Sequence, residues 1–375
     1  MLCVCVHRDL RCFLQDGRSA KEKAFRPIAN RAGEARVWTK SQRILLISVI
    51  GTAISVFNVW PARSEVDEVR IGVQFGLIYL PVTVADAQGF FAQEATKAGL
   101  KEFKVNIRRF SGTPAINDAL FSGSVDLGVL GTPGLLIAWD KTRGKQDVAG
   151  LAALGANPFI LETNRPDLKV FTDLSEQDRI AVPATTSPQA IVMRMAAEWF
   201  YGPGQYARID PLLVSMPHPE ATIALLAGRA VITAYVATPP FIAALRKSDK
   251  IHAVLTSKDI LEGEEATGVI LSAFKLFVDR NPVTSKVIVA GLEDAMDFIV
   301  KNPDKAADVY LKSEAANMPK DDIIGMLTDG SILYSVAPTG IMKFARFMAK
   351  TGQIRNEPKS WQEVFFSSLG NRSGS

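Results

Sequence analysis

One stretch of the chain occurs twice, and this repeat restricts the fold more than any other feature. Residues 111–134 and 217–240 each hold, in the same order, a Pro near a helix start, an Ala-Leu-x-x-Gly helix end, an apolar strand and a Thr-Pro turn. Pro suits the first helical turn because its missing N–H needs no partner there, and Gly suits the residue after a helix because it adopts positive φ freely. The pattern predicts one α/β unit used once in each of two similar lobes. Four residue pairs share an offset of 105 positions: Pro114 and Pro219, Ala119 and Ala224, Leu120 and Leu225, Gly123 and Gly228.

From residue 65 onward, expected strands alternate with expected helices. Such alternation indicates α/β domains with mostly parallel sheets that are covered on both faces. We expect a first lobe over residues 65–163, a second lobe over 164–262, and a return to the first lobe with C-terminal helices over 263–375. A chain that passes twice between two lobes forms a hinge beside a cleft. The sequence therefore predicts a two-lobed α/β fold with two crossovers.

Local signals place the individual elements. The alternating run FKVNIRRF predicts a strand over Phe103–Phe110, and the run that follows Pro81 predicts a single helix to about Lys97. Further strands are expected over 158–163, at the end of the first lobe, and over Ile209–Met216. A helix is expected over Thr113–Phe121, in the first copy of the repeat.

The first 64 residues differ from the rest in charge and cysteine content. They carry a net charge of +7 against +4 for the whole chain, so residues 65–375 carry −3. All three cysteines also lie in this first part, and the remainder holds only two histidines, His218 and His252. A weakly acidic body without cysteine is a poor candidate for a nucleic-acid binder, a zinc protein or a disulfide scaffold.

Residues 40–64 have the features of an export signal that follows a basic leader. A basic segment over 40–43 precedes an apolar run over 44–60, and Ala62 and Ser64 place small residues at positions −3 and −1 of a cut before Glu65. We therefore expect an exported, periplasmic protein. The alternative is an uncleaved anchor that tethers a sensor domain, because the apolar run is near the shortest length that spans a bilayer.

The sequence lacks the motifs of several enzyme classes. It contains no G-x-x-x-x-G-K-[ST], no H-E-x-x-H and no G-x-S-x-G, and residues 65–375 offer no cysteine nucleophile. The glycine-rich run at 128–134 does not match the dinucleotide fingerprint. We therefore expect no enzyme, no metal and no cofactor, although an unmarked pair of carboxylates leaves open an enzyme on the same scaffold.

Loops that carry Ser, Thr or Gly recur between a strand end and a helix start, at 76–79, 111–113, 131–132, 185–187 and 237–238. Ligands of open α/β sheets lie outside the carboxyl ends of strands, and helix N-termini favour anions there. Each loop taken alone is also compatible with an ordinary helix cap, and the two tyrosines are equally compatible with the core. The candidate ligand-binding residues are Gly76, Tyr79, Ser111, Gly112, Thr132, Thr185, Thr186, Ser187, Tyr235 and Thr238.

Other polar residues are not assigned to the ligand. Arg108 and Arg109 lie in an expected strand, and His218, between two prolines, is expected to be a helix cap or a surface residue.

The order of these motifs resembles that of periplasmic solute-binding proteins of ABC importers, in the nitrate, sulfonate and taurine group that is also similar to binders of thiamine-pyrimidine precursors. The segments that carry the resemblance are VRIGVQF (69–75), FSG (110–112), VDLGVLGTPG (125–134), ALLAGRAVITAYVATPPF (224–241) and NPVTSKVIVAGLEDAMDFI (281–299). The resemblance implies a type II periplasmic-binding-protein fold, with the candidate residues above in its cleft. It also implies a monomer that captures a small solute and delivers it to a separate ABC permease and ATPase. A small organic anion such as a sulfonate, taurine or nitrate is the expected ligand. A pyrimidine or other neutral aromatic solute that stacks on Tyr79 and Tyr235 is the alternative.

Overall fold

The computed structural model describes residues 65–228, 231–314, 318–367 and 374–375, all of them in one unit that spans Arg63–Ser375. The predicted export signal and the alternative anchor lie outside the described residues. Within those residues, no helix is long and apolar enough to cross a membrane.

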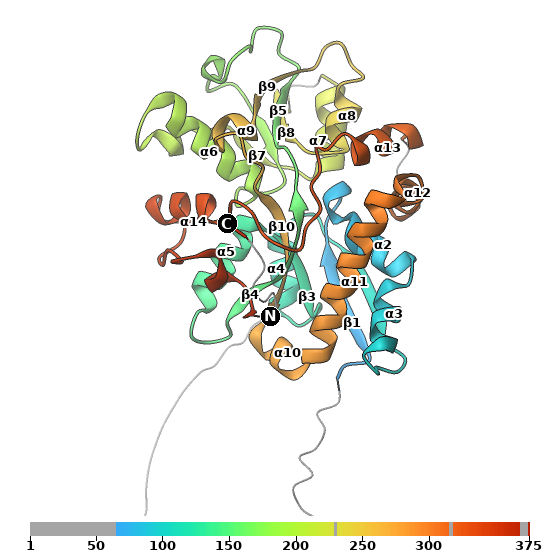
Figure 1. Cartoon of the computed structure of the whole chain (residues 1–375). Coiled ribbons are helices and arrows are strands. Elements are labelled where there is room, and N and C mark those ends of the chain that lie inside the picture. The colour runs from blue at the N-terminus through green and yellow to red at the C-terminus, as the bar shows by residue number, and fades with distance from the viewer. Residues whose placement is uncertain (1–64, 229–230, 315–317, 368–373) are drawn as a thin grey trace, which may run out of the picture. The chain divides into compact units, whose positions relative to one another are not determined.

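Two five-stranded sheets with the same topology form the centres of the two lobes (Figure 1). The first sheet has the order β2-β1-β3-β10-β4 and the second β7-β6-β8-β5-β9. In each sheet one strand, β10 or β5, runs antiparallel to both of its neighbours, and the other four strands share one direction. The strands of the first sheet are β1 (Glu68–Val73), β2 (Lys104–Arg109), β3 (Leu127–Gly131), β4 (Val148–Ala156) and β10 (Thr267–Phe274). Those of the second are β5 (Ile160–Thr163), β6 (Ile180–Val182), β7 (Leu213–Ser215), β8 (Ala234–Ala237) and β9 (His252–Thr256).

The repeated stretch occupies the same place in both lobes. In the first lobe α4 (Thr113–Phe121) leads into β3, and in the second α7 (His218–Leu226) leads into β8. Both strands stand third in the order of their sheets. The structure thus confirms the prediction of one α/β unit used twice.

The two antiparallel strands carry the chain between the lobes. The predicted boundary after residue 163 assigns 158–163 to the first lobe, but β5 pairs with β8 and β9 of the second sheet. The first crossover therefore lies upstream, between Ala156 and Ile160. An apolar strand is compatible with either sheet, and here its pairing partners decide. On the return, β10 pairs with β4 so that Thr267 lies opposite Ala156.

Two hydrophobic clusters cover the first sheet. One includes side chains of α2, α3, α11 and α12. The other includes side chains of α4, α5 and α14 and continues into α6 of the second lobe.

The helices of the first lobe and its C-terminal extension are α2 (Leu80–Ala87), α3 (Phe90–Lys97), α4, α5 (Thr132–Thr142), α10 (Lys275–Arg280), α11 (Pro282–Lys301), α12 (Pro303–Glu314), α13 (Lys320–Thr328) and α14 (Ile341–Lys350). Those of the second lobe are α6 (Pro188–Tyr201), α7, α8 (Phe241–Leu245) and α9 (Ser257–Ile260). Short 3₁₀ turns are η1 (Leu77–Tyr79), η2 (Phe171–Asp173), η3 (Gln205–Leu212) and η4 (Trp361–Val364).

Two predicted elements have a different extent in the structure. The single helix expected to Lys97 is interrupted before α3 by Gly89, whose φ of 74° is in the left-handed region. The strand expected over Ile209–Met216 is reduced to β7, because η3 occupies the first part of this range. Pro211 lies in η3 and has no N–H to donate to a strand neighbour.

Candidate functional site

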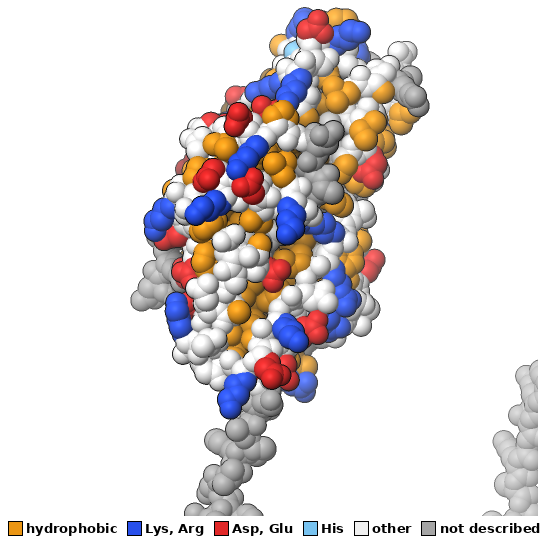
Figure 2. All heavy atoms as spheres, turned by 90° about the vertical axis from the view of Figure 1, so that its right-hand side faces the viewer, with side chains coloured by type: hydrophobic (Ala, Val, Ile, Leu, Met, Phe, Trp, Pro, Cys, Tyr) orange, Lys and Arg blue, Asp and Glu red, His pale blue; other side chains and the backbone are white. Residues whose placement is uncertain are grey.

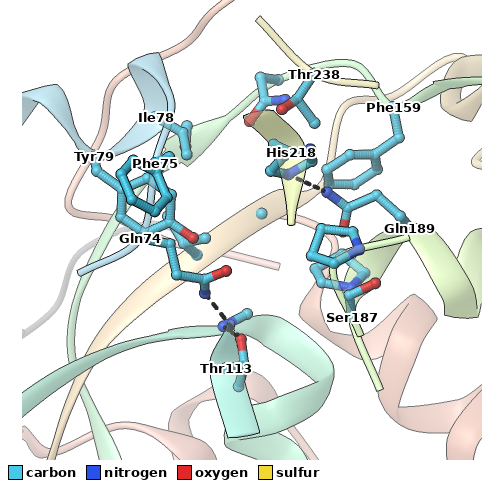
Figure 3. A pocket seen from close by; sticks show the side chains of 16 residues that line it. Gln74, Phe75, Ile78, Tyr79, Thr113, Phe159, Ser187, Gln189, His218 and Thr238 are labelled. Atoms are coloured by element: carbon cyan, nitrogen blue, oxygen red, sulfur yellow. Dashed lines mark hydrogen bonds between the residues drawn. The ribbon is translucent and has the colours of Figure 1, made fainter. Parts of the chain in front are cut away.

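A small cavity lies between the two lobes, at the carboxyl ends of the parallel strands of both sheets (Figure 3). Gln74 follows β1, Gly131 ends β3, Pro183 follows β6 and Thr238 follows β8, and all four line it. The cavity volume is about 30 Å³, which is room for about two water molecules. The location is the one in which open α/β sheets bind ligands.

The wall of the cavity is polar but uncharged. None of the sixteen described residues that line it is Asp, Glu, Lys or Arg. Rings and aliphatic side chains complete the wall. The polar side chains are Gln74, Tyr79, Thr113 and Asn157 from the first lobe and the crossover, and Ser187, Gln189, His218 and Thr238 from the second lobe.

In the first lobe, the hydroxyl of Thr113 is fixed by two donors. Gln74 Nε2 and the backbone N–H of Gly131 each donate to Thr113 Oγ1, both at 3.1 Å. Thr113 is the first residue of α4 and is almost fully buried. Because its oxygen already accepts two hydrogen bonds, its own O–H proton is left to donate to a further acceptor.

In the second lobe, His218 forms the corresponding group. It is the first residue of α7, and Gln189 Nε2 lies 3.3 Å from His218 Nε2. With the Gln189 nitrogen as donor, His218 Nε2 accepts, and the proton on Nδ1 is donated to the hydroxyl of Tyr235. The ring also stacks on Phe241, with 5.1 Å between ring centroids. Burial lowers the pKa of His218 to about 3, so the imidazole is neutral at neutral pH.

Ser187 supplies a further hydroxyl from the second lobe. It caps α6, and its Oγ accepts the backbone N–H of Ala190 at 3.2 Å. Its O–H proton is free to donate, like that of Thr113. The N-termini of α4, α6 and α7 all lie at the cavity, so the positive ends of three helix dipoles add to these donors.

Three glycines of the first lobe lie against the second lobe. A Cβ at Gly131 would be too close to the opposite lobe, so Gly131 permits the contact, whereas a Cβ at Gly112 or Gly76 would lie at an ordinary van der Waals distance. Leu77 N also donates to Pro239 O across the contact at 3.3 Å. A Cβ built on Gly131 would lie 2.8 Å from Pro188 Cδ, one on Gly112 3.4 Å from Pro183 O, and one on Gly76 3.4 Å from Pro239 O.

The ten predicted site residues are in several environments. Tyr79, Ser187 and Thr238 line the cavity, whereas Ser111 and Thr185 are exposed and Thr186 is half-buried outside the lining. Thr132 is fully buried and donates to the backbone oxygen of Thr267. Tyr235 is fully buried behind His218, and Gly76 and Gly112 lie at the contact between lobes. Ligand binding by any of them stays a prediction.

The sequence-based candidates do not include five polar residues of the wall: Gln74, Thr113, Asn157, Gln189 and His218. The expectation that His218 is a helix cap or surface residue is wrong, because it is 8% exposed and lines the cavity. A signal was available, since His218 lies 105 positions after Thr113, the offset that relates the two copies of the repeat.

Two observations on the part of the chain that the structure describes concern metal binding and nucleic-acid binding. No group of three or more His, Cys, Asp and Glu side chains is placed to hold a metal ion. On the face shown in Figure 2, Lys and Arg side chains are interspersed with Asp and Glu. That face is therefore not the one-sign basic surface by which nucleic-acid binders are recognised.

Comparison with known proteins gives consistent matches. Residues 62–311 match the NMT1-like family. Over 307 residues, 77% of this chain and 89% of the relative, the chain is 24% identical to the taurine-binding periplasmic protein of Escherichia coli K12.

Solved structures share the fold. The alkanesulfonate-binding protein SsuA of Xanthomonas axonopodis pv. citri, bound to MOPS, has a TM-score of 0.62 and 16% identity and covers 80% of this chain and 97% of its own. The periplasmic nitrate-binding protein NrtA of Synechocystis PCC 6803 has a TM-score of 0.62 and 18% identity, with 80% and 84% covered. These likenesses confirm the predicted two-lobed periplasmic-binding-protein fold.

Proposed function

The chain belongs to the NMT1-like family, and on that premise we propose that it is the exported substrate-binding component of an ABC importer. It captures a small organic anion between its lobes and delivers it to a membrane permease that works with a separate ATPase. The relatives named above, which bind taurine, alkanesulfonates and nitrate, support this role.

One observation carries the proposal: the cavity wall combines hydrogen-bond donors from both lobes and no charged side chain. A ligand that contacts donors on both sides stabilises the closed form relative to the open one, which is the differential affinity that closure requires. Thr113 and Ser187 supply two such hydroxyls, one from each lobe.

The donors favour an anion. Hydroxyl and amide groups together with helix N-termini bind oxyanions without a neutralising ion pair. The cavity volume of about 30 Å³ suits a compact group such as nitrate or a sulfonate head rather than a large solute.

A second candidate ligand is a pyrimidine or similar neutral ring. The side-chain amides of Gln74, Asn157 and Gln189 can both donate and accept, and the rings of Phe75 and Phe159 lie in the same wall. These groups could pair with a heterocycle edge and stack on its faces.

Thermal unfolding in the presence of a compound panel tests the proposal. The panel contains nitrate, methanesulfonate, ethanesulfonate, taurine, dicarboxylates and pyrimidines. A compound present at 100 times its Kd raises the free energy of unfolding by about 2.7 kcal/mol. Stabilisation by nitrate or a sulfonate supports the proposal, stabilisation by pyrimidines alone supports the second candidate, and recovery of a chemically altered compound supports an enzyme instead.

The proposed export has its own test. The mass of the protein isolated from the periplasm should correspond to a chain that begins near Glu65. If the protein is instead found in the membrane fraction and still contains residues 44–60, this would contradict cleavage and support the anchored alternative.

A further inference from the structure

A partly buried ion pair lies behind the first-lobe wall of the cavity. Arg109 Nη1 is 2.6 Å from Glu314 Oε1, and the two side chains are only 21% and 7% exposed. Arg109 is the last residue of β2 and Glu314 the last residue of α12. Neither lines the cavity, so neither contacts a ligand held there.

Arg109 touches the residues that form the wall. Its Nη1 donates to the backbone oxygen of Gln74 at 3.0 Å, and its guanidinium lies 5.9 Å from the ring centroid of Phe75. Both Gln74 and Phe75 line the cavity. The charge of Arg109 therefore lies one residue away from the ligand space, and the intervening groups are buried protein rather than water. The Arg109 side chain is only 21% exposed, although it also lines an open hollow on the surface. Because the protein on the cavity side screens its charge less than bulk water would, the charge still acts on a bound anion.

We propose that Glu314 sets the affinity of the cavity for anions, by neutralising the Arg109 charge that would otherwise attract an anion through the wall. Removing the negative charge of Glu314 leaves Arg109 uncompensated and strengthens the binding of anions but not of neutral solutes of the same shape. This inference rests on the proposed function, since it concerns the same cavity.

Glu314 is also able to change charge near neutral pH. Burial raises its pKa to about 7, against the opposing effect of Arg109. Burial also raises the pKa values of the tyrosines around it, so these stay neutral at this pH. The ionisable groups around the pair are Tyr79 from η1 and Tyr310 on α12, with Tyr334 beside Tyr310, and Asp86, Asp308 and Lys312 in the surface hollow that Arg109 lines.

The sign of the pH effect follows from linkage. An anion in the cavity favours the protonated form of Glu314, so binding of the anion takes up a proton and its affinity rises as the pH falls through about 7. A neutral ligand has no such dependence.

Calorimetric titration with a charge-matched pair of probes tests the proposal. Ethanesulfonate is an anion between pH 6 and pH 8, and ethanesulfonamide is its neutral analogue of similar shape. We expect the wild-type protein to bind ethanesulfonate several-fold more tightly at pH 6 than at pH 8. Glu314→Gln should bind it about 10-fold more tightly than wild type at pH 8, equivalent to about 1.4 kcal/mol, and should lose the dependence on pH. Arg109→Gln should bind it more weakly.

Two controls separate this role from a structural one. Ethanesulfonamide affinity should be the same in wild type and Glu314→Gln, which also shows that the cavity is intact. Asp126→Asn removes the partner of Arg70 in a 2.7 Å ion pair near the other end of the same sheet, and should change neither affinity.

Each outcome decides a separate point. The inference is wrong if wild type binds ethanesulfonate with the same affinity at pH 6 and pH 8. It is also wrong if Glu314→Gln changes the affinities for ethanesulfonate and ethanesulfonamide by the same factor relative to wild type. In both cases the proposed function stands. If wild type binds no anion of the panel, the proposed function is wrong, and this inference with it. The wild-type pH comparison needs no variant, so it decides the matter even if Glu314→Gln fails to fold.

Discussion

Thr113 and His218 lie on opposite sides of one cavity, each as the first residue of the helix that precedes the third strand of its sheet (Figure 3). Each is also paired with the side-chain nitrogen of a glutamine that lines the cavity, Gln74 at 3.1 Å and Gln189 at 3.3 Å. The two lobes thus present similar polar groups to whatever lies between them. This arrangement explains how a cavity without charged side chains can hold a polar solute from both sides.

Tyr235 should act on the ligand through His218. Tyr235→Phe removes the hydroxyl that holds His218 Nδ1, so the imidazole loses its fixed orientation. We expect a loss of about 1–2 kcal/mol in the free energy of unfolding and a weaker affinity for ethanesulfonate. Tyr201→Phe is a matched control, because its hydroxyl makes only a 3.4 Å contact with Phe171 O far from the cavity wall. Equal effects of the two changes on affinity would contradict the role of Tyr235.

Gly131→Ala should hinder closure of the lobes. The new methyl group would lie 2.8 Å from Pro188 Cδ of the opposite lobe, closer than carbon atoms approach. We expect at least a 10-fold weaker affinity for ethanesulfonate, because the methyl group destabilises the closed form that holds the ligand relative to the open form. Small-angle scattering should show less compaction on ligand addition than in wild type. Gly325→Ala, a helical position with open space around it, should close normally.

The pH dependence of stability should contain a contribution from His218. Burial lowers its pKa to about 3 in the folded protein, against about 6.5 in the unfolded chain. The unfolded state therefore binds the proton more readily, and the stabilising contribution of the neutral ring is complete above pH 6.5. It is lost as the pH falls from 6.5 toward 3, by about 1.4 kcal/mol per pH unit. Denaturant titrations of ligand-free protein should show this slope in wild type and not in His218→Gln.

Asp178 should be the most sensitive carboxylate of the second lobe. It is 1% exposed and accepts hydrogen bonds from Arg165 at 2.6 Å, from Ser175 and from Thr233. Burial alone would raise the pKa of Asp178, but these hydrogen bonds together lower it below its usual value. We expect Asp178→Ala to reduce the free energy of unfolding by about 2–4 kcal/mol, because it leaves several donors without their acceptor.

Asp167 offers the control for Asp178, because it contacts the same Arg165 and is 69% exposed. Asp167→Ala should cost less than about 1 kcal/mol. A similar loss in the free energy of unfolding in both variants would mean that the burial of Asp178 does not increase its contribution to stability. Since the folded pKa of Asp178 is depressed, its contribution is present above pH 4 and should disappear as the pH falls below that value.

Much of the fold could be predicted because local signals and tertiary context agree. The helix expected over Thr113–Phe121 has those bounds in the structure, since Pro114 and Gly123 mark its two ends. The strand expected over Phe103–Phe110 is β2, which is one residue shorter at each end. The local sequence could not assign β5 to a lobe, because an apolar strand can be buried in either sheet. The residues with which β5 pairs in β8 lie more than 70 positions away in the sequence.

The candidate site was harder to predict for a different physical reason. Hydroxyl and glycine loops at strand ends identify where helices begin, but the same residues serve as caps, as buried supports or as parts of the wall. Thr132 and Ser187 both follow a strand in such loops, yet Thr132 bonds to Thr267 and only Ser187 lines the cavity. Side-chain direction depends on packing, which the pattern of residue types does not contain. The amides Gln74 and Gln189 belong to no motif.

The pairing of Ala156 with Thr267 has a consequence for how the chain is built. These residues are neighbours on adjacent antiparallel strands, so residues 157–266 amount to a single very long hairpin connection, within which all five strands of the second sheet lie. In principle a short turn could replace that connection and leave the first sheet's strand order unchanged, and the excised segment could be grafted from a relative as a cassette. New solute preferences could therefore arise by exchanging this one insert.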